Sequence, residues 1–212
     1  MTPLQTHHAQ IAEHMIKQLK KRNMEGFFCK TCEEAQTLVS SLIAPNTSVS
    51  FGGSVTLTQT GILTALEARN DLTILDRSKA QSPEEIQDIY RKAFYCDTYL
   101  MSSNAITRDG ELINIDGNGN RVAALMYGPS QVVVIVGINK ICFSLEEGLC
   151  RAQNTAAPAN CLRLKKQTPC AATGDCRNCQ SPDCICAQTV ITRRSLIPGR
   201  IKVVLLDGNW GY

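Results

Sequence analysis

Five cysteines near the end of the chain have the spacing of a metal-binding site. They are Cys170, Cys176, Cys179, Cys184 and Cys186. The two residues between Cys176 and Cys179 let one turn of backbone supply two tetrahedral ligands. Cys170 and Cys186 complete a set of four, in which Cys184 could replace either. Thiolate ligands suit zinc or an iron–sulfur cluster, but the spacing matches neither common ferredoxin pattern. We therefore predict a metal at Cys170, Cys176, Cys179 and Cys186. The alternative is a group of redox-labile or simply buried thiols.

A glycine-rich turn is the second candidate site. Gly52, Gly53, Ser54 and Thr56 lie between a predicted strand at residues 48–51 and a predicted helix. Glycines allow a ligand to approach the backbone, and a helix N-terminus presents free N–H groups to an anion. The two hydroxyls add donors. The alternative is an ordinary strand-to-helix turn in which Ser54 caps the helix.

A second loop places polar groups beside two glycines at Asp116, Gly117, Gly119, Asn120 and Arg121. The pattern resembles a dinucleotide-binding fingerprint, but its third glycine is missing and no acidic residue follows at the required distance, which excludes a nicotinamide site. Arginine recognises carboxylate and phosphate with two parallel hydrogen bonds, so we predict an anionic ligand here. The alternative is a solvated turn in which Arg121 pairs with Asp116.

Polar residues also follow two predicted strands directly. Gly137, Asn139 and Lys140 come after the apolar run at residues 132–136, and Asn104 comes after a strand at residues 99–102. Open α/β sheets bind ligands at the carboxyl ends of their strands. We therefore predict that these loops share one crevice, in which Arg121 and Lys140 clamp a small anionic ligand. The alternative for Lys140 is a surface position.

Strands and helices must alternate to bring these loops together, and the sequence predicts that they do. The pattern is typical of a mostly parallel sheet covered by helices. Asp109-Gly110 predicts a hairpin turn between residues 105–107 and 112–115. Residues 156–189 are predicted to form a cysteine-rich, irregular excursion within a single domain, residues 1–212. The other predicted strands are 27–29, 72–75 and 201–206, and the predicted helices are 5–24, 31–43, 56–68, one beginning at 82, 122–126 and 144–154.

Composition excludes several classes of protein. With 43% hydrophobic and 19% charged residues, the chain of 212 residues is neither disordered nor too small for its own core. No apolar stretch is long enough to cross a membrane, and residues 1–10 do not form a signal peptide, so we expect a cytoplasmic protein. There, its 11 cysteines are more often metal ligands, redox groups or core residues than disulfides.

Positive charge is concentrated around the cysteines. Residues 151–202 contain nine Lys and Arg but only two Asp, a net charge of +7, whereas the whole chain carries +3. This charge either offsets thiolates or attracts an anionic partner. Nucleic acid is not favoured as that partner, because aromatic residues make up only 5% and no known reading motif is present.

Several long motifs resemble those of the LUD-domain family, which comprises lactate-utilization proteins of the LutC type and is also called DUF162. The motifs stand at residues 51–56, 102–107, 114–121, 127–129 and 136–140. The cysteine segment, residues 168–186, is similar to that of short members of the family. The resemblance implies the fold shared by sugar-phosphate isomerases, CoA-transferases and formyltetrahydrofolate cyclo-ligase (NagB/RpiA/CoA transferase-like). It also implies a link to lactate oxidation alongside iron–sulfur oxidoreductase subunits.

Two departures from these relatives leave it open whether the protein is an enzyme. The chain lacks the ferredoxin module of larger LUD proteins, and residues 102–105 lack the glutamate that CoA-transferases use as a nucleophile. One hypothesis is a redox-associated protein that binds a small organic anion and carries an iron–sulfur cluster or zinc. The other is a non-catalytic regulatory or assembly subunit whose basic segment is held by zinc. The oligomeric state stays open.

Overall fold

A six-stranded parallel sheet forms the centre of the protein, for which a computed structural model describes residues 2–212. The strand order is β1-β10-β7-β4-β2-β3, and every neighbouring pair is parallel. The prediction of a mostly parallel sheet covered by helices is therefore confirmed. The strands are β1 (Glu25–Cys29), β2 (Thr47–Phe51), β3 (Leu72–Leu75), β4 (Thr98–Met101), β7 (Gln131–Gly137) and β10 (Ile201–Leu206).

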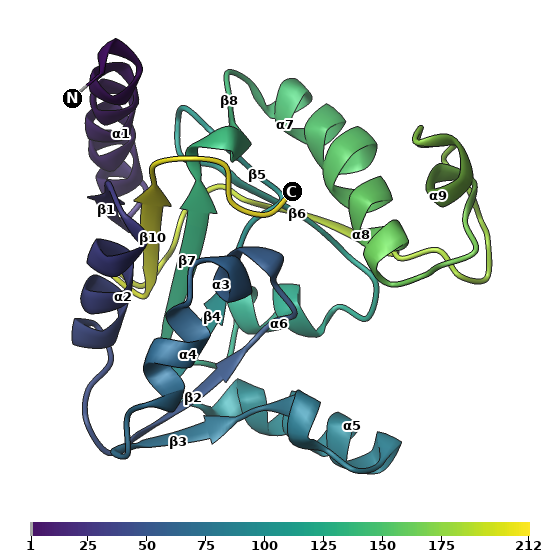
Figure 1. Cartoon of the computed structure of the whole chain (residues 1–212), viewed down its shortest axis with the longest axis horizontal. Coiled ribbons are helices and arrows are strands. Elements are labelled where there is room, and N and C mark those ends of the chain that lie inside the picture. The colour runs from purple at the N-terminus through teal and green to yellow at the C-terminus, as the bar shows by residue number, and fades with distance from the viewer. Residues whose placement is uncertain (1) are drawn as a thin grey trace.

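Helices cover both faces of this sheet (Figure 1). One face packs against α1 (Pro3–Lys21) and α6 (Asn120–Met126), and the other packs against α2 (Cys32–Ser41), α3 (Val55–Gln59) and α4 (Ile62–Glu67). The apolar run in β7 explains why two layers are needed. Val132 and Val134 point to the first face and Val133 to the second, because side chains alternate along a strand. All three are fully buried, as predicted for a central strand.

A second, four-stranded sheet extends the fold beyond the sequence prediction. Its strand order is β8-β5-β6-β9. The predicted hairpin between β5 and β6 is confirmed, and Gly110 adopts a φ of +90° in its turn. Helix α7 (Leu145–Arg151) packs on this sheet. The strands are β5 (Ala105–Thr107), β6 (Leu112–Asp116), β8 (Ile141–Cys142) and β9 (Gln188–Thr192).

The predicted helix at residues 56–68 is two helices instead of one. Helix α3 ends before Gly61, which adopts a left-handed φ of +69°, and α4 begins at the next residue. A left-handed residue cannot continue an α-helix, so the chain turns there. Ser54 caps α3 by accepting a hydrogen bond from the Leu57 N–H. The alternative reading of Ser54 as an N-cap therefore describes its local role.

The prediction that residues 156–189 are irregular is wrong for the first part of that segment. Helix α7 continues through a five-residue π-helical turn, Ala152–Ala156, into α8 (Ala157–Arg163). Pro158, which has no N–H to donate, stands two residues after the π-helical turn, so the helix departs from regular α-helical hydrogen bonding where proline removes a donor. A further short helix, α9 (Pro169–Thr173), ends at Gly174. The segment from Gly174 to β9 is irregular as predicted.

Short helical turns complete the chain. Helix α5 (Pro83–Lys92) begins at the predicted N-cap Ser82. Two 3₁₀ turns follow strands of the parallel sheet: η1 (Arg77–Lys79) after β3, and η3 (Ile138–Lys140) after β7. Among residues 2–212, no helix combines the length and the apolar character needed to cross a membrane.

Candidate functional site

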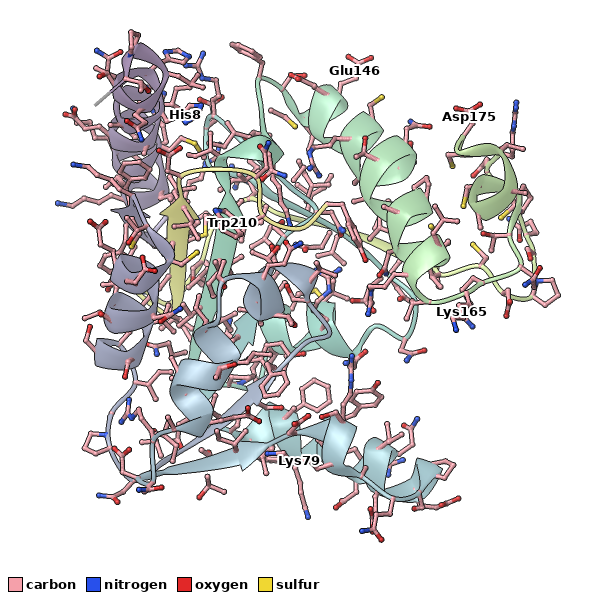
Figure 2. The ribbon with its side chains drawn as sticks, viewed as in Figure 1. His8, Lys79, Glu146, Lys165, Asp175 and Trp210 are labelled. Carbon is pink, nitrogen blue, oxygen red and sulfur yellow. The ribbon has the colours of Figure 1, made fainter. Side chains whose placement is uncertain are left out.

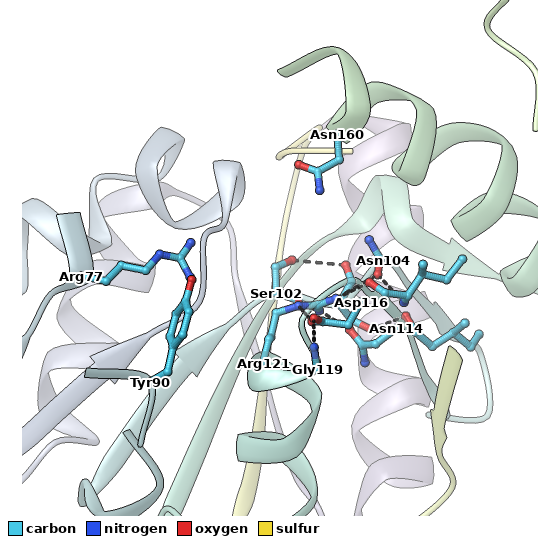
Figure 3. A network of polar contacts seen from close by, with 12 residues as sticks. Arg77, Tyr90, Ser102, Asn104, Asn114, Asp116, Gly119, Arg121 and Asn160 are labelled. Atoms are coloured by element: carbon cyan, nitrogen blue, oxygen red, sulfur yellow. Dashed lines mark hydrogen bonds and ion pairs between the residues drawn. The ribbon is translucent and has the colours of Figure 1, made fainter. Parts of the chain in front are cut away.

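The carboxyl ends of the parallel strands open into a cleft. It consists of a cavity of about 490 Å³ and a smaller inner cavity of about 70 Å³. The two adjoin, because both are lined by Gly53, Asn104, Arg121 and Asn160. Figure 3 shows the Arg121 network on one side of this space, Arg77 with Tyr90 opposite it, and Asn160 above. Ligands of open α/β sheets bind at this edge.

Lys140 lies at the inner end of the cleft. It is only 2% exposed, and its Nζ donates to Thr56 Oγ1 at 2.9 Å and to Ser102 Oγ at 3.0 Å. Among residues 2–212, no carboxylate lies within ion-pair distance of this amine. Burial, reinforced by the positive charges of Arg151 and Arg121, lowers the pKa of Lys140 to about 7. At neutral pH the amine therefore exists in both charged and neutral forms.

Arg121 is fully occupied by the protein itself. Its Nε donates to Asp116 Oδ2 at 3.0 Å. Its Nη1 donates to the Ser102 carbonyl and to Asn114 Oδ1, and its Nη2 donates to the Ile115 carbonyl and to Asn104 Oδ1 (Figure 3). A guanidinium has five N–H donors, and all five are used here, so none is free to bind a ligand. Arg121 thereby ties the end of β4 to the end of β6.

The two acidic side chains that line the larger cavity are both paired. Asp116 lies 3.0 Å from Arg121, and Asp183 lies 3.3 Å from Lys166. Asp116 also accepts a hydrogen bond from the N–H of Gly119, which caps the turn before α6. The negative charges of the wall are therefore balanced within the wall itself.

Two further arginines line the larger cavity, and neither was predicted from the sequence. The Arg77 guanidinium stacks over the Tyr90 ring at 5.4 Å, donates to the Tyr90 hydroxyl at 3.1 Å, and lies against Gly53. Arg163 donates to Asn160 Oδ1 from Nε and Nη2. No carboxylate within residues 2–212 forms an ion pair with either arginine. Arg77 is the second residue after β3, so the strand-end rule could have found it.

The structure brings most of the predicted ligand-binding residues to the cleft. Nine line it: Gly53, Ser54, Thr56, Asn104, Asp116, Gly117, Asn120, Arg121 and Lys140. The other four line neither cavity: Gly52, Gly119, Gly137 and Asn139. Gly52 packs against the aliphatic part of Arg121, where a side chain would be crowded.

The last described residues cross the inner end of the cleft. Asn139 accepts a hydrogen bond from the Trp210 N–H and donates one to the Gly211 carbonyl. Thr56 donates to the Trp210 carbonyl at 3.1 Å. Figure 2 shows Trp210 between the central sheet and the α7–α8 arm. Asn139 therefore positions this segment, and Gly211 and Tyr212 form part of the wall of the inner cavity.

The cysteines predicted to bind a metal lie in an outer arm, residues 157–187, which comprises α8, α9 and the loop that follows. Cys170 stands in α9 and the others in the loop, where partial desolvation and the nearby Cys184 and Cys176 raise the pKa of Cys186. Cys170 is buried, Cys176 and Cys179 are half-buried, and Cys186 is exposed. Within residues 2–212, no three Cys, His, Asp or Glu side chains are arranged to hold a metal ion. The metal at these thiols therefore stays a prediction.

Cys161 is a thiol of this region that the spacing argument missed. It is buried on α8, and burial raises its pKa, with further contributions from the neighbouring thiols Cys170 and Cys184. Cys184 also lines the larger cavity. Because Cys161 lies nine residues before Cys170 on a different helix, only the fold brings the two together.

The fold and the cleft define an α/β protein with a polar cleft at the carboxyl edge of a parallel sheet. The sequence model of the LUD domain matches residues 12–206, so the chain belongs to the LUD-domain family, as its motifs predicted. Its fold is similar to that of a DUF162 family protein from Deinococcus radiodurans. That likeness has a TM-score of 0.53 at 12% identity and covers 95% of this chain and 98% of the other. No curated protein matches the chain.

Proposed function

We propose that this LUD-domain protein binds a small organic anion, a carboxylate, in the cleft, and that it serves the oxidation of lactate or a related organic acid. One observation carries the proposal. Arg77, Lys140 and Arg163 line the connected cavities, and none has a carboxylate partner among residues 2–212.

Electrostatics favours an anion over a neutral ligand. The acidic side chains of the wall are neutralised by Arg121 and Lys166, so the three remaining cations give the cleft a net positive charge. A buried cation without a partner is costly, and a bound carboxylate offsets that cost through charge-assisted hydrogen bonds. Lys140, at 2% exposure, gains most from such a partner.

The proposal assigns Arg121 a different part from the clamp expected from the sequence. All five of its donors are used by the protein, so contact with a ligand would require an existing hydrogen bond to break. Arg121 instead holds the loop that shapes the cleft. The anion then lies against Arg77, Lys140 and Arg163.

Calorimetric titration with oxalate and lactate tests the anion site. Each charge-assisted hydrogen bond is worth about 1.5–3 kcal/mol, so replacing the half-buried Arg77 in Arg77→Met should weaken binding about tenfold or more. Arg163→Met should have a smaller effect, because Arg163 is exposed and solvent screens its charge. Arg194→Met is the matched control, because Arg194 is exposed and does not line the cleft. Unchanged affinity in the double variant Arg77→Met/Arg163→Met would contradict the proposal.

A second candidate is a thiol-bound metal in the outer arm, either an iron–sulfur cluster that exchanges electrons with partner subunits or a zinc that holds the basic segment. The influence of the Cys170 and Cys184 thiols on the pKa of Cys161 favours it, because it brings three thiols into one neighbourhood. Anaerobic purification followed by metal analysis and an absorption spectrum tests this candidate. A colourless, metal-free protein would contradict both versions.

A further inference from the structure

Lys140 is a primary amine enclosed by hydroxyl groups. Thr56 Oγ1 and Ser102 Oγ hold its Nζ at 2.9 and 3.0 Å, and the amine forms part of the wall of the inner cavity. Each hydroxyl has its own acceptor, because Thr56 donates to the Trp210 carbonyl and Ser102 to the Ser103 carbonyl. The hydroxyl oxygens therefore face the amine with their lone pairs and fix its position.

The surroundings of Lys140 favour an uncharged amine. Burial and the nearby Arg151 and Arg121 lower its pKa to about 7, so a large share of the side chain is neutral at physiological pH. Arg151 is held in place by the carbonyls of Asn139 and Asn104, which makes its charge a fixed part of the site. A desolvated lysine beside another cation is a nucleophile toward carbonyl carbon.

We infer that Lys140 forms an imine with the carbonyl group of a small 2-oxo acid held in the cleft. The inference rests on the proposed function, because it needs the positively charged walls of the two adjoining cavities to hold the acid's carboxylate. The inner cavity of about 70 Å³ has room for about five water-sized groups, enough for the reacting end of such an acid. The larger adjoining cavity accommodates the remainder.

The reaction is balanced without an oxidant or reductant. The lone pair of the neutral Nζ attacks the carbonyl carbon, and the carbonyl oxygen takes up a proton that leaves the nitrogen. Ser102 and Thr56, both in contact with Nζ, are placed to relay this proton. Loss of water from the resulting neutral carbinolamine gives the neutral imine, and uptake of one proton from solvent gives the protonated imine. Arg121 and Arg151 disfavour that charge, and the carboxylate of the bound acid offsets them.

Reductive trapping of the full-length protein tests the imine. The protein is incubated with pyruvate and sodium cyanoborohydride, and the modified lysine is located by peptide mass spectrometry. We expect one adduct per chain on Lys140, and no adduct at that position in Lys140→Met. The matched control is Lys20→Met, which removes an exposed lysine of α1 and should leave the adduct unchanged. Mapping of the unaltered protein locates the adduct even if Lys140→Met does not fold.

Two added ligands separate the inference from the proposed function. Oxalate has no ketone, so it should compete with pyruvate and suppress the adduct without forming one. If calorimetry records pyruvate binding but the label is absent or spread evenly over exposed lysines, the imine is overturned and the anion site stands. If neither pyruvate nor oxalate binds, both are overturned.

Discussion

Replacing Lys140 with methionine should make the protein more stable at neutral pH. The pKa of this lysine falls from an ordinary value of 10.5 to about 7 on folding. Each pKa unit corresponds to about 1.36 kcal/mol, so keeping the charged amine buried costs about 5 kcal/mol below pH 7. Methionine has a similar length and no charge. Its introduction removes this cost and also two hydrogen bonds, worth about 1 kcal/mol each. The expected net stabilisation near pH 6.5 is about 3 kcal/mol.

The sharper test is how the difference in unfolding free energy between Lys140→Met and the unaltered protein changes with pH. Because the folded pKa lies below the unfolded one, the folded state holds fewer protons between about pH 7 and 10.5, and stability rises with pH in that window. Below pH 7 the lysine is protonated in both states and its cost is fully present. The advantage of Lys140→Met should therefore shrink by about 2.5 kcal/mol between pH 7.5 and 9.5, since the slope is about 1.36 kcal/mol per pH unit.

Urea unfolding under reducing conditions, followed by circular dichroism, measures both quantities. Subtracting the curves of the two proteins removes the titration of all groups they share. Lys20→Met, at an exposed site, should differ from the unaltered protein by less than about 0.5 kcal/mol at every pH. A stability difference that does not change between pH 7.5 and 9.5 would refute the reasoning. Lys140 would then be charged in the folded protein throughout.

Three further outcomes are expected. Arg121→Met should destabilise the fold by about 3–5 kcal/mol in urea unfolding, because it leaves the buried Asp116 carboxylate without its cationic partner. It should also weaken oxalate binding indirectly, because the loop at residues 116–121 loses the side chain that holds it. Gly61→Ala should cost about 1–2 kcal/mol in the same assay, because its φ of +69° suits glycine; a neutral effect would mean that the α3–α4 break moves freely. Cys161→Ser should lower the metal content of anaerobically purified protein if the arm binds a metal, whereas Cys150→Ser on α7 should not; equal loss in both variants would contradict a role for Cys161.

Local signals predicted the central sheet well, because each depends on a few neighbouring residues. The Val132–Val136 run lies in the buried strand β7, and the Ser82 cap begins α5. In the second sheet only the β5–β6 hairpin had such a signal, the Asp109-Gly110 turn. Strand β8 has two residues, and β6 pairs Asp116 with Gln188, a partner far along the chain. Such pairings are decided by the packing of α7 on the sheet, which no short sequence pattern encodes.

The sequence predicted where the cleft lies, but not which of its residues are free to bind a ligand and which only hold the structure. The rule that ligands bind at strand ends identified Lys140 and Asn104, and it would have identified Arg77 if applied to the residue pair after β3. It could not separate a binding arginine from a structural one. Arg121 became structural only because the Ser102 and Ile115 carbonyls converge on it from two strand ends of different sheets.

The cost of burying Lys140 and the capacity of the cleft to bind an anion have the same physical origin. Burying the charged Lys140 without a carboxylate partner costs free energy, and the fixed charges of Arg121 and Arg151 increase that cost. A bound anion would offset it. An anion that arrives beside Lys140 should therefore raise its pKa, so that binding above pH 7 takes up a proton from solution. Removing the lysine would stabilise the empty protein and weaken the complex. A purely structural lysine would produce the first effect without the second.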